Sequence, residues 1–97
     1  MTATLFSTID RYIDRLFAPS DPVLEAAEQA MEAAALPPIQ ISAGQGKFLY
    51  LLAKMIDAQR ILEIGTLGGY STIWLARALG PGGHLVTLEF EPHHAEV

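Results

Sequence analysis

The first third of the chain carries apolar residues at the spacing of a helix. They recur at steps of three and four from Leu5 to Phe17, with charged residues between them, which predicts an amphipathic helix over that range. This stripe suits packing in a core, and it equally suits a dimer interface or a cap over a substrate. A second helix is predicted to begin at Asp21-Pro22, an N-cap followed by a proline at the first helical position.

A third helix is predicted after the break at Pro37-Pro38. Ser42 and Gln45 have the spacing of a capping box, and apolar residues follow as far as about Ile56. Because these apolar residues surround much of the helix, we expect it to be buried against a sheet. Its N-terminus, beside Lys47, is expected near the glycine turn, where Lys47 either assists a ligand or is solvated.

The central stretch of the chain predicts a strand, a tight turn and a helix. Arg60 to Ile64 is a short apolar run typical of a strand buried on both faces, and it is followed by Gly65, Gly68 and Gly69. A helix is expected over 70–79 and a second strand over 84–88. This order predicts an α/β, Rossmann-like sheet that begins with two parallel strands joined by a crossover helix.

The residue types of the turn favour a cationic ligand. Its spacing is G-x-x-G-G, whereas a dinucleotide turn needs G-x-G-x-x-G. Glu63 lies at the carboxyl end of the first strand, two residues before Gly65, where a carboxylate repels a pyrophosphate and attracts an ammonium group. Glu89 ends the second strand, 24 positions after Gly65, close to the spacing at which an acidic residue binds ribose hydroxyls.

These motifs resemble those of the class I S-adenosylmethionine-dependent methyltransferases, and within them the small O-methyltransferases related to catechol and caffeoyl-CoA O-methyltransferase. The similar segments are I-Q-I-S-A-G-Q-G-K-F-L from Ile39, I-L-E-I-G-T-L-G-G-Y-S-T-I-W-L-A from Ile61 and T-L-E from Thr87. The resemblance covers 39–97. It implies an N-terminal helical arm over 1–42 and the first part of the cofactor-binding domain over 43–97.

The resemblance also implies roles for individual residues. Ile41 would contact the methionine part of S-adenosylmethionine, Ser71 would bind its carboxylate and Glu89 its ribose. Phe90 would pack against the adenine. Apart from the resemblance, Tyr70 and Trp74 are interpreted as core residues, and Tyr70 as one that closes the turn. The implied cofactor-binding residues are Ile41, Glu63, Gly65, Thr66, Gly69, Tyr70, Ser71, Glu89 and Phe90.

The function implied by this resemblance is methyl transfer to a small phenolic or catechol-like hydroxyl. The metal ligands and the catalytic base of the family follow the region seen here, so a divalent cation such as Mg²⁺ would be held by residues outside this chain, and the 97 residues alone are expected to be inactive. Two alternatives are a nicotinamide-dependent oxidoreductase and a non-catalytic assembly module. A homodimer or other self-association is expected, because a first strand without its neighbours leaves an unpaired edge.

The composition argues against several kinds of partner and site. A net charge of −5 with six scattered basic residues argues against nucleic acid as a partner. The absence of cysteine excludes disulfides and thiolate metal sites, and the chain shows no leader and no long apolar run, so a cytoplasmic protein without a membrane partner is expected. His93 and His94 follow Pro92 and are interpreted as the start of a surface helix, with no metal role.

Overall fold

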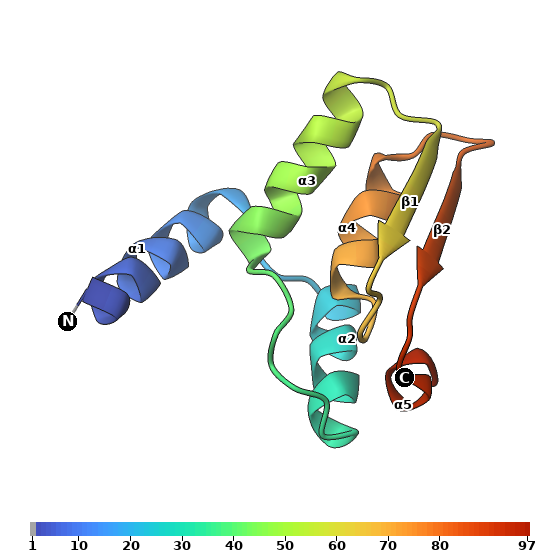
Figure 1. Cartoon of the computed structure of the whole chain (residues 1–97). Helices are drawn as coiled ribbons and strands as arrows, with labels where there is room; N and C mark the ends of the chain where they lie inside the picture. The colour runs from blue at the N-terminus through green and yellow to red at the C-terminus, as the bar shows by residue number, and fades with distance from the viewer. Residues whose placement is uncertain (1) are drawn as a thin grey trace.

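The computed structural model describes residues 2–97, and Met1, where the predicted 1–42 arm begins, lies outside them. The order of elements predicted from the sequence is confirmed. Figure 1 shows two neighbouring strands with α4 alongside them, and α1 extending away from the rest. The elements are α1 (Thr2–Phe17), α2 (Pro22–Ala33), α3 (Ala43–Met55), β1 (Arg60–Ile64), α4 (Tyr70–Ala78), β2 (His84–Leu88) and α5 (Pro92–Ala95).

The two strands form a parallel pair. Arg60 lies opposite His84 and Ile64 lies opposite Leu88, with α4 as the connection between the strands. The predicted strand-turn-helix-strand unit is therefore confirmed. This pairing matters for function because parallel strands bring their carboxyl ends, and the turns that follow them, to one edge of the sheet.

One face of this sheet is open in residues 2–97, and the prediction that β1 is buried on both faces is wrong. Side chains alternate along a strand, so Ile61 and Glu63 point toward α4 and are half-buried. Leu62 and Ile64 point the other way and are 63% and 82% exposed. No helix in the described part of the chain covers that face, which β2 continues with exposed Val86 and Leu88.

Helix α3 packs against α4 and α1, so the expected burial of α3 against the sheet is also wrong. It approaches α4 through its small residues, since Gly46 and Ala53 are its buried positions. A Cβ atom at Gly46 would overlap the Trp74 ring, so glycine is what permits this close approach. Most of the larger apolar side chains of α3 face away from α4, and Met55 is 80% exposed.

The buried core is small and lies mainly between α2 and α4. Leu24 is the most deeply buried large side chain, and Tyr70 and Trp74 from α4 pack in the same cluster. Tyr50 of α3 adds an edge-on contact to Trp74 at 6.5 Å between ring centroids. The cluster consists of Ala18, Leu24, Met31, Leu36, Tyr70 and Trp74.

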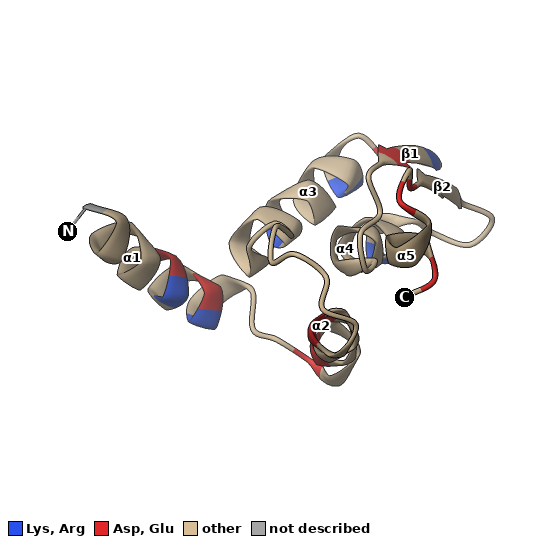
Figure 2. Ribbon diagram, turned by 60° about the horizontal axis from the view of Figure 1, so that its bottom comes forward, with Lys and Arg blue, Asp and Glu red and all other residues tan. Residues whose placement is uncertain are grey.

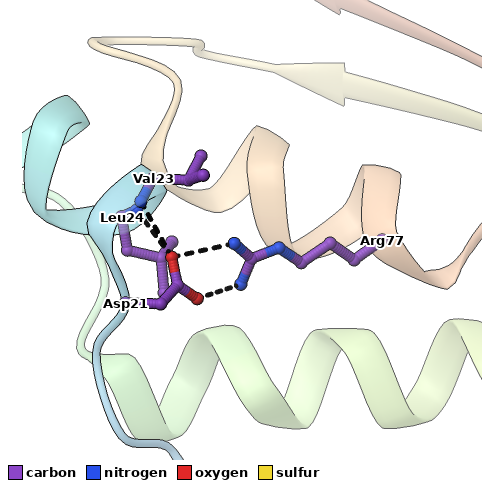
Figure 3. Close-up of polar contacts among 4 residues, drawn as sticks. All are labelled: Asp21, Val23, Leu24 and Arg77. Atoms are coloured by element: carbon purple, nitrogen blue, oxygen red, sulfur yellow. Dashed lines mark hydrogen bonds and ion pairs between the residues drawn. The ribbon is translucent and has the colours of Figure 1, made fainter.

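Asp21 links the start of α2 to α4. Its Oδ1 accepts hydrogen bonds from the backbone N–H groups of Val23 and Leu24, as the N-cap prediction requires. The same carboxylate forms a two-pronged ion pair with the Arg77 guanidinium, at 2.7 and 3.0 Å (Figure 3). The Arg77 hydrogen bond and the backbone N–H of Leu24 hold the pKa of Asp21 at about 2, below the ordinary value of 3.8.

The six basic residues are distributed over four elements, as Figure 2 shows in blue. They are Arg11 and Arg15 on α1, Lys47 and Lys54 on α3, Arg60 on β1 and Arg77 on α4. No helix within residues 2–97 combines the length and the apolar character needed to cross a bilayer.

The Asp21–Arg77 ion pair predicts a pH dependence of stability. Because the folded state holds the Asp21 pKa at about 2, its stabilisation is complete above pH 4 and is lost as the pH falls through 2. We expect Asp21→Asn, which keeps a capping side chain, to lower the melting temperature at pH 7 and to lower it progressively less as the pH falls toward 2. Thermal unfolding followed by circular dichroism from pH 7 to 2 measures this.

Asp10→Asn, at an exposed position of α1, is the matched control and should leave the melting temperature unchanged across the range. A constant difference between Asp21→Asn and the unsubstituted chain at all pH values would contradict the prediction.

Candidate functional site

The turn between β1 and α4 is built on left-handed backbone. Gly65 and Gly69 have φ angles of +96° and +88°, which L side chains rarely adopt, and Leu67 has +52°. Gly65 N–H donates to the Leu88 carbonyl at 2.7 Å, which joins the turn to the end of β2. Gly69 is the N-cap of α4. The turn therefore lies at the carboxyl edge of the sheet, with the backbone N–H groups at the start of α4 directed toward it.

Glu89 holds the turn by accepting backbone hydrogen bonds. Its Oε1 accepts the backbone N–H of Leu67 at 2.7 Å, and its Oε2 accepts that of Glu91 at 3.1 Å. These two hydrogen bonds, the Leu67 bond first, keep the pKa of the Glu89 carboxyl below its ordinary value. Each carboxylate oxygen keeps a further lone pair, so Glu89 still has the capacity to accept two hydroxyl groups of a ligand.

Glu63 lies beneath the same turn and is surrounded by hydroxyl groups. Ser71 Oγ donates to its Oε2 at 2.5 Å, Thr87 Oγ1 donates to its Oε1 at 2.9 Å, and Thr72 also donates to Oε1. These donors come from α4 and β2. The carboxylate thus joins three elements at the point where both strands end.

A cavity of about 370 Å³ lies between this turn, α2, the 39–41 segment and α5. Its volume is within the range of small-molecule sites. Seven of the nine residues predicted from the sequence line it, namely Ile41, Gly65, Thr66, Tyr70, Ser71, Glu89 and Phe90. Phe90 is 98% exposed, so its ring is free to cover a ligand at the mouth. The individual cofactor contacts of these residues stay predictions.

The other two predicted residues do not line the cavity. Glu63 is turned toward the hydroxyl groups beneath it, and Gly69 acts through its backbone angle. Sequence reasoning missed seven lining residues, which are Met31, Ile39, Gln40, Leu67, Gly68, Glu91 and His94. Ile39 and Gln40 lie inside the resembling segment and Leu67 and Gly68 inside the turn, so the motifs already pointed to their positions. Met31 lies in the helix predicted to begin at Asp21-Pro22, and that prediction did not indicate a ligand site.

Helix α2 supplies a wall of the cavity that packs directly on the turn. Met31 is buried, and a Cβ atom at Gly68 would overlap its Cγ and Sδ, so the methionine lies directly on the glycine backbone. Tyr70 is also buried on this side, and burial raises the pKa of its phenol above the ordinary value of 10. The prediction that Tyr70 closes the turn fits this position between the turn and the core.

Helix α5 closes the other end of the cavity. His93 and His94 lie at its start, as predicted from Pro92. His93 Nε2 lies 2.8 Å from the Ala34 carbonyl, so this nitrogen donates and ties α5 to the end of α2. His94 lines the cavity with Nδ1 at 3.7 Å from Glu89 Oε2. Within residues 2–97 no three His, Asp or Glu side chains form a group able to hold a metal ion.

A larger hollow of about 810 Å³ adjoins this cavity on the side of α1. The two share Gln40, Ile41 and Tyr70 as a common wall. Arg11 and Arg15 line the hollow from α1. The 40–41 segment therefore lies between the smaller cavity beside the glycine turn and the larger hollow beside the N-terminal helix.

Comparison with known proteins identifies the family. Residues 17–97 match the sequence family described as O-methyltransferase. The chain belongs to this family. It is 60% identical over 89 residues to a catechol O-methyltransferase of Mycobacterium tuberculosis, which covers 92% of this chain and 40% of that protein. It is 50% identical over 97 residues to a catechol O-methyltransferase of Niastella koreensis, which covers 100% of this chain and 44% of the relative.

Solved structures of the family also resemble this chain. The O-methyltransferase of Bacillus cereus, solved in complex with S-adenosylhomocysteine, superposes with a TM-score of 0.88 at 52% identity, over 92% of this chain and 40% of that one. The chain thus spans 40–44% of the length of the two catechol O-methyltransferases. This likeness confirms the predicted fold class, an α/β portion with the first two parallel strands of an O-methyltransferase.

The contact between Met31 and Gly68 predicts a coupled effect on stability. Gly68→Ala adds a methyl group where Met31 lies, and such overpacking costs about 1–3 kcal/mol. Met31→Ala leaves a buried cavity and costs about 2–5 kcal/mol alone. We expect the double variant to be less destabilised than the sum of the two, because the second change makes room for the first. Urea unfolding of the four chains measures the coupling.

Gly80→Ala serves as the control for the added methyl group, since a Cβ atom there meets nothing within 4 Å. Additive losses in the double variant would show that Met31 does not lie on the turn.

Proposed function

We propose that the chain forms the S-adenosylmethionine-binding part of an O-methyltransferase that acts on a small phenolic or catechol-like hydroxyl. One observation carries the proposal: seven residues that the motif assigned to this cofactor line one cavity at the carboxyl edge of a parallel sheet. The catechol O-methyltransferases among the relatives, and the S-adenosylhomocysteine complex of the Bacillus cereus protein, support it.

The residues of the cavity fit the parts of this cofactor. Glu89 is ionised and positioned to accept hydrogen bonds from ribose hydroxyls, and Phe90 beside it offers an exposed ring for the adenine. Thr66 and Ser71 line the opposite part of the wall with polar oxygens near the Glu63 carboxylate, which suits the amino-acid end. Ile41 and Met31 supply apolar surface between them.

The chain's part in the reaction is to hold and orient the donor. When bound, S-adenosylmethionine supplies a methyl group already activated by its sulfonium, so the main requirement is alignment for in-line attack by the acceptor oxygen. The 40–41 segment would keep the donor in the cavity beside the glycine turn, away from the larger hollow. The divalent cation implied by the resemblance is not part of this proposal, because residues 2–97 supply no cluster of ligands for it.

Ligand titration tests the donor site. We expect S-adenosylhomocysteine to bind in isothermal titration calorimetry and NAD to give no heat, because Glu63 and the G-x-x-G-G turn disfavour a pyrophosphate. At a hundred times its dissociation constant the ligand should add about 2.7 kcal/mol to the stability of the chain. Glu89→Ala should weaken binding about tenfold to a hundredfold, since it removes a charged acceptor.

Glu25→Ala, at an exposed position on α2, is the matched control and should bind like the unsubstituted chain. Binding of NAD in place of S-adenosylhomocysteine would overturn the proposal and favour a nicotinamide-dependent enzyme.

We also propose that the chain self-associates through exposed apolar surface. The stripe of α1 is one such surface, and every apolar side chain on it is at least 40% exposed. The open face of the sheet is another. The α1 stripe consists of Leu5, Phe6, Ile9, Tyr12, Ile13, Leu16 and Phe17. An apolar helical stripe of this size is typical of an interface between copies.

Light scattering coupled to size-exclusion chromatography tests this association. We expect a mass above 10.5 kDa for the unsubstituted chain and a shift toward that mass for Ile9→Glu, which places a charge in the middle of the stripe. Leu62→Glu places the same charge on the open sheet face. Comparing the two variants shows which of the two surfaces forms the contact between copies. A monomer of the unsubstituted chain at all concentrations would contradict the proposal.

A further inference from the structure

A histidine and a carboxylate lie next to each other in the cavity wall, just after β2 ends. Within residues 2–97, His94 of α5 is the only histidine that lines the cavity, and its Nδ1 lies 3.7 Å from Oε2 of Glu89. The two side chains are 21% and 13% exposed, so salt screens their interaction less than it would on an open surface. The protonation of this imidazole therefore changes what Glu89 offers to a ligand.

A neutral His94 leaves Oε2 of Glu89 partly open. The N–H···O hydrogen bonds of proteins span about 2.7–3.2 Å, and the distance from Nδ1 to Oε2 is longer than this. Oε2 accepts one hydrogen bond, from the backbone N–H of Glu91 at 3.1 Å. A carboxylate oxygen has two lone pairs, so one remains for a hydroxyl group in the cavity.

A protonated His94 competes for that lone pair. Imidazolium carries a proton on both ring nitrogens, and its charge attracts the carboxylate. Nδ1 is already within ion-pair distance of Oε2, so a small movement of the ring lets it donate to that oxygen. A proton on His94 and a ligand hydroxyl on Oε2 then exclude each other.

We propose that His94 is a positioning residue that acts through Glu89: its neutral form leaves Oε2 open to a hydroxyl of the bound donor, and its protonated form occupies that oxygen. The inference rests on the proposed function and goes beyond it, because it links donor binding to a proton. The sign of the linkage follows from the competition. Binding is strongest where His94 is neutral and weakens as the pH falls through the range in which imidazole titrates.

The other ionisable groups of the cavity keep their charge in that range. They are Glu89 after β2, Glu91 at the start of α5 and Tyr70 of α4. Carboxyl groups ordinarily titrate below about pH 5. Burial raises the pKa of the Tyr70 phenol above its ordinary value, so this group stays neutral. From α2 the cavity receives Met31, which does not ionise.

The neighbouring His93 does not provide the same switch. Its Nε2 donates to the Ala34 carbonyl at 2.8 Å, and this nitrogen keeps its proton whether the ring is neutral or charged. The contact that ties α5 to α2 therefore persists on both sides of the titration. His84, the third histidine of the chain, is exposed at the opposite end of β2.

Calorimetric titration with S-adenosylhomocysteine tests the linkage. We expect the unsubstituted chain to bind about twofold to fivefold more weakly at pH 5 than at pH 8, since an ion pair of this kind is the competitor. At about pH 6.5, binding should release protons, which titrations in two buffers of different ionisation enthalpy detect. His94→Gln should bind with the same affinity at both pH values and release none.

His84→Gln is the matched control, because it removes an imidazole far from the cavity, and it should keep the pH dependence. Any titration of the ligand itself is common to the three chains and cancels in the comparison. Binding by the unsubstituted chain that is independent of pH, or stronger in acid, would overturn the role of His94, as would an unchanged pH dependence in His94→Gln. Absence of binding at every pH would instead overturn the proposed function.

A measurement without ligand tests the contact between His94 and Glu89 by itself. The backbone N–H of Glu91 bonds to Oε2, so its NMR signal responds when His94 becomes charged and approaches that oxygen. We expect this signal to shift between pH 8 and 5 in the unsubstituted chain and in His84→Gln, and to stay in place in His94→Gln. A shift of the same size in His94→Gln would show that the His94 proton does not reach Glu89.

Discussion

The structure depends on two carboxylates that hold the turn between β1 and α4 through different hydrogen-bond partners. Glu63 gathers hydroxyl groups from β2 and α4 beneath the turn, and Glu89 accepts the Leu67 and Glu91 backbone N–H groups at its rim. Leu67 has a left-handed φ of +52°, which is costly for a branched side chain and persists only where its surroundings fix it. The hydrogen bond to Glu89 is such a constraint, so the acidic residue assigned to the ribose also shapes the turn that lies beside it.

Much of the fold and most of the site could be predicted from the sequence, because the decisive signals are local. The Asp21-Pro22 start, the Ser42–Gln45 capping box and the glycine turn each depend on residues within a few positions of one another. Glu89 is further along the chain, but the parallel pairing of two adjacent strands brings it to Gly65 by rule, since Gly65 N–H bonds to the Leu88 carbonyl.

The errors concern surfaces whose partners are not local. The apolar run of β1 signals burial on two faces, yet only the face toward α4 is covered in residues 2–97. Helix α3 has more apolar residues than its contact with α4 can bury. It packs on α4 through Gly46, because a glycine lets the Trp74 ring approach. The hydrophobicity of a residue indicates that it favours burial, but not which neighbour covers it. Here Gly46, the smallest residue of the helix face, determines the contact between α3 and α4.

The position of α2 shows why Met31 could not be found as a site residue. Its helix is fixed at one end by the Asp21–Arg77 ion pair with α4 and at the other by the hydrogen bond between His93 and the Ala34 carbonyl (Figure 3 shows the first). Both contacts join residues more than fifty positions apart. Between them Met31 is held against Gly68 and forms a wall of the cavity. The motif specifies the turn and its acids, whereas the wall facing them comes from an ordinary amphipathic helix that two distant polar contacts hold in place.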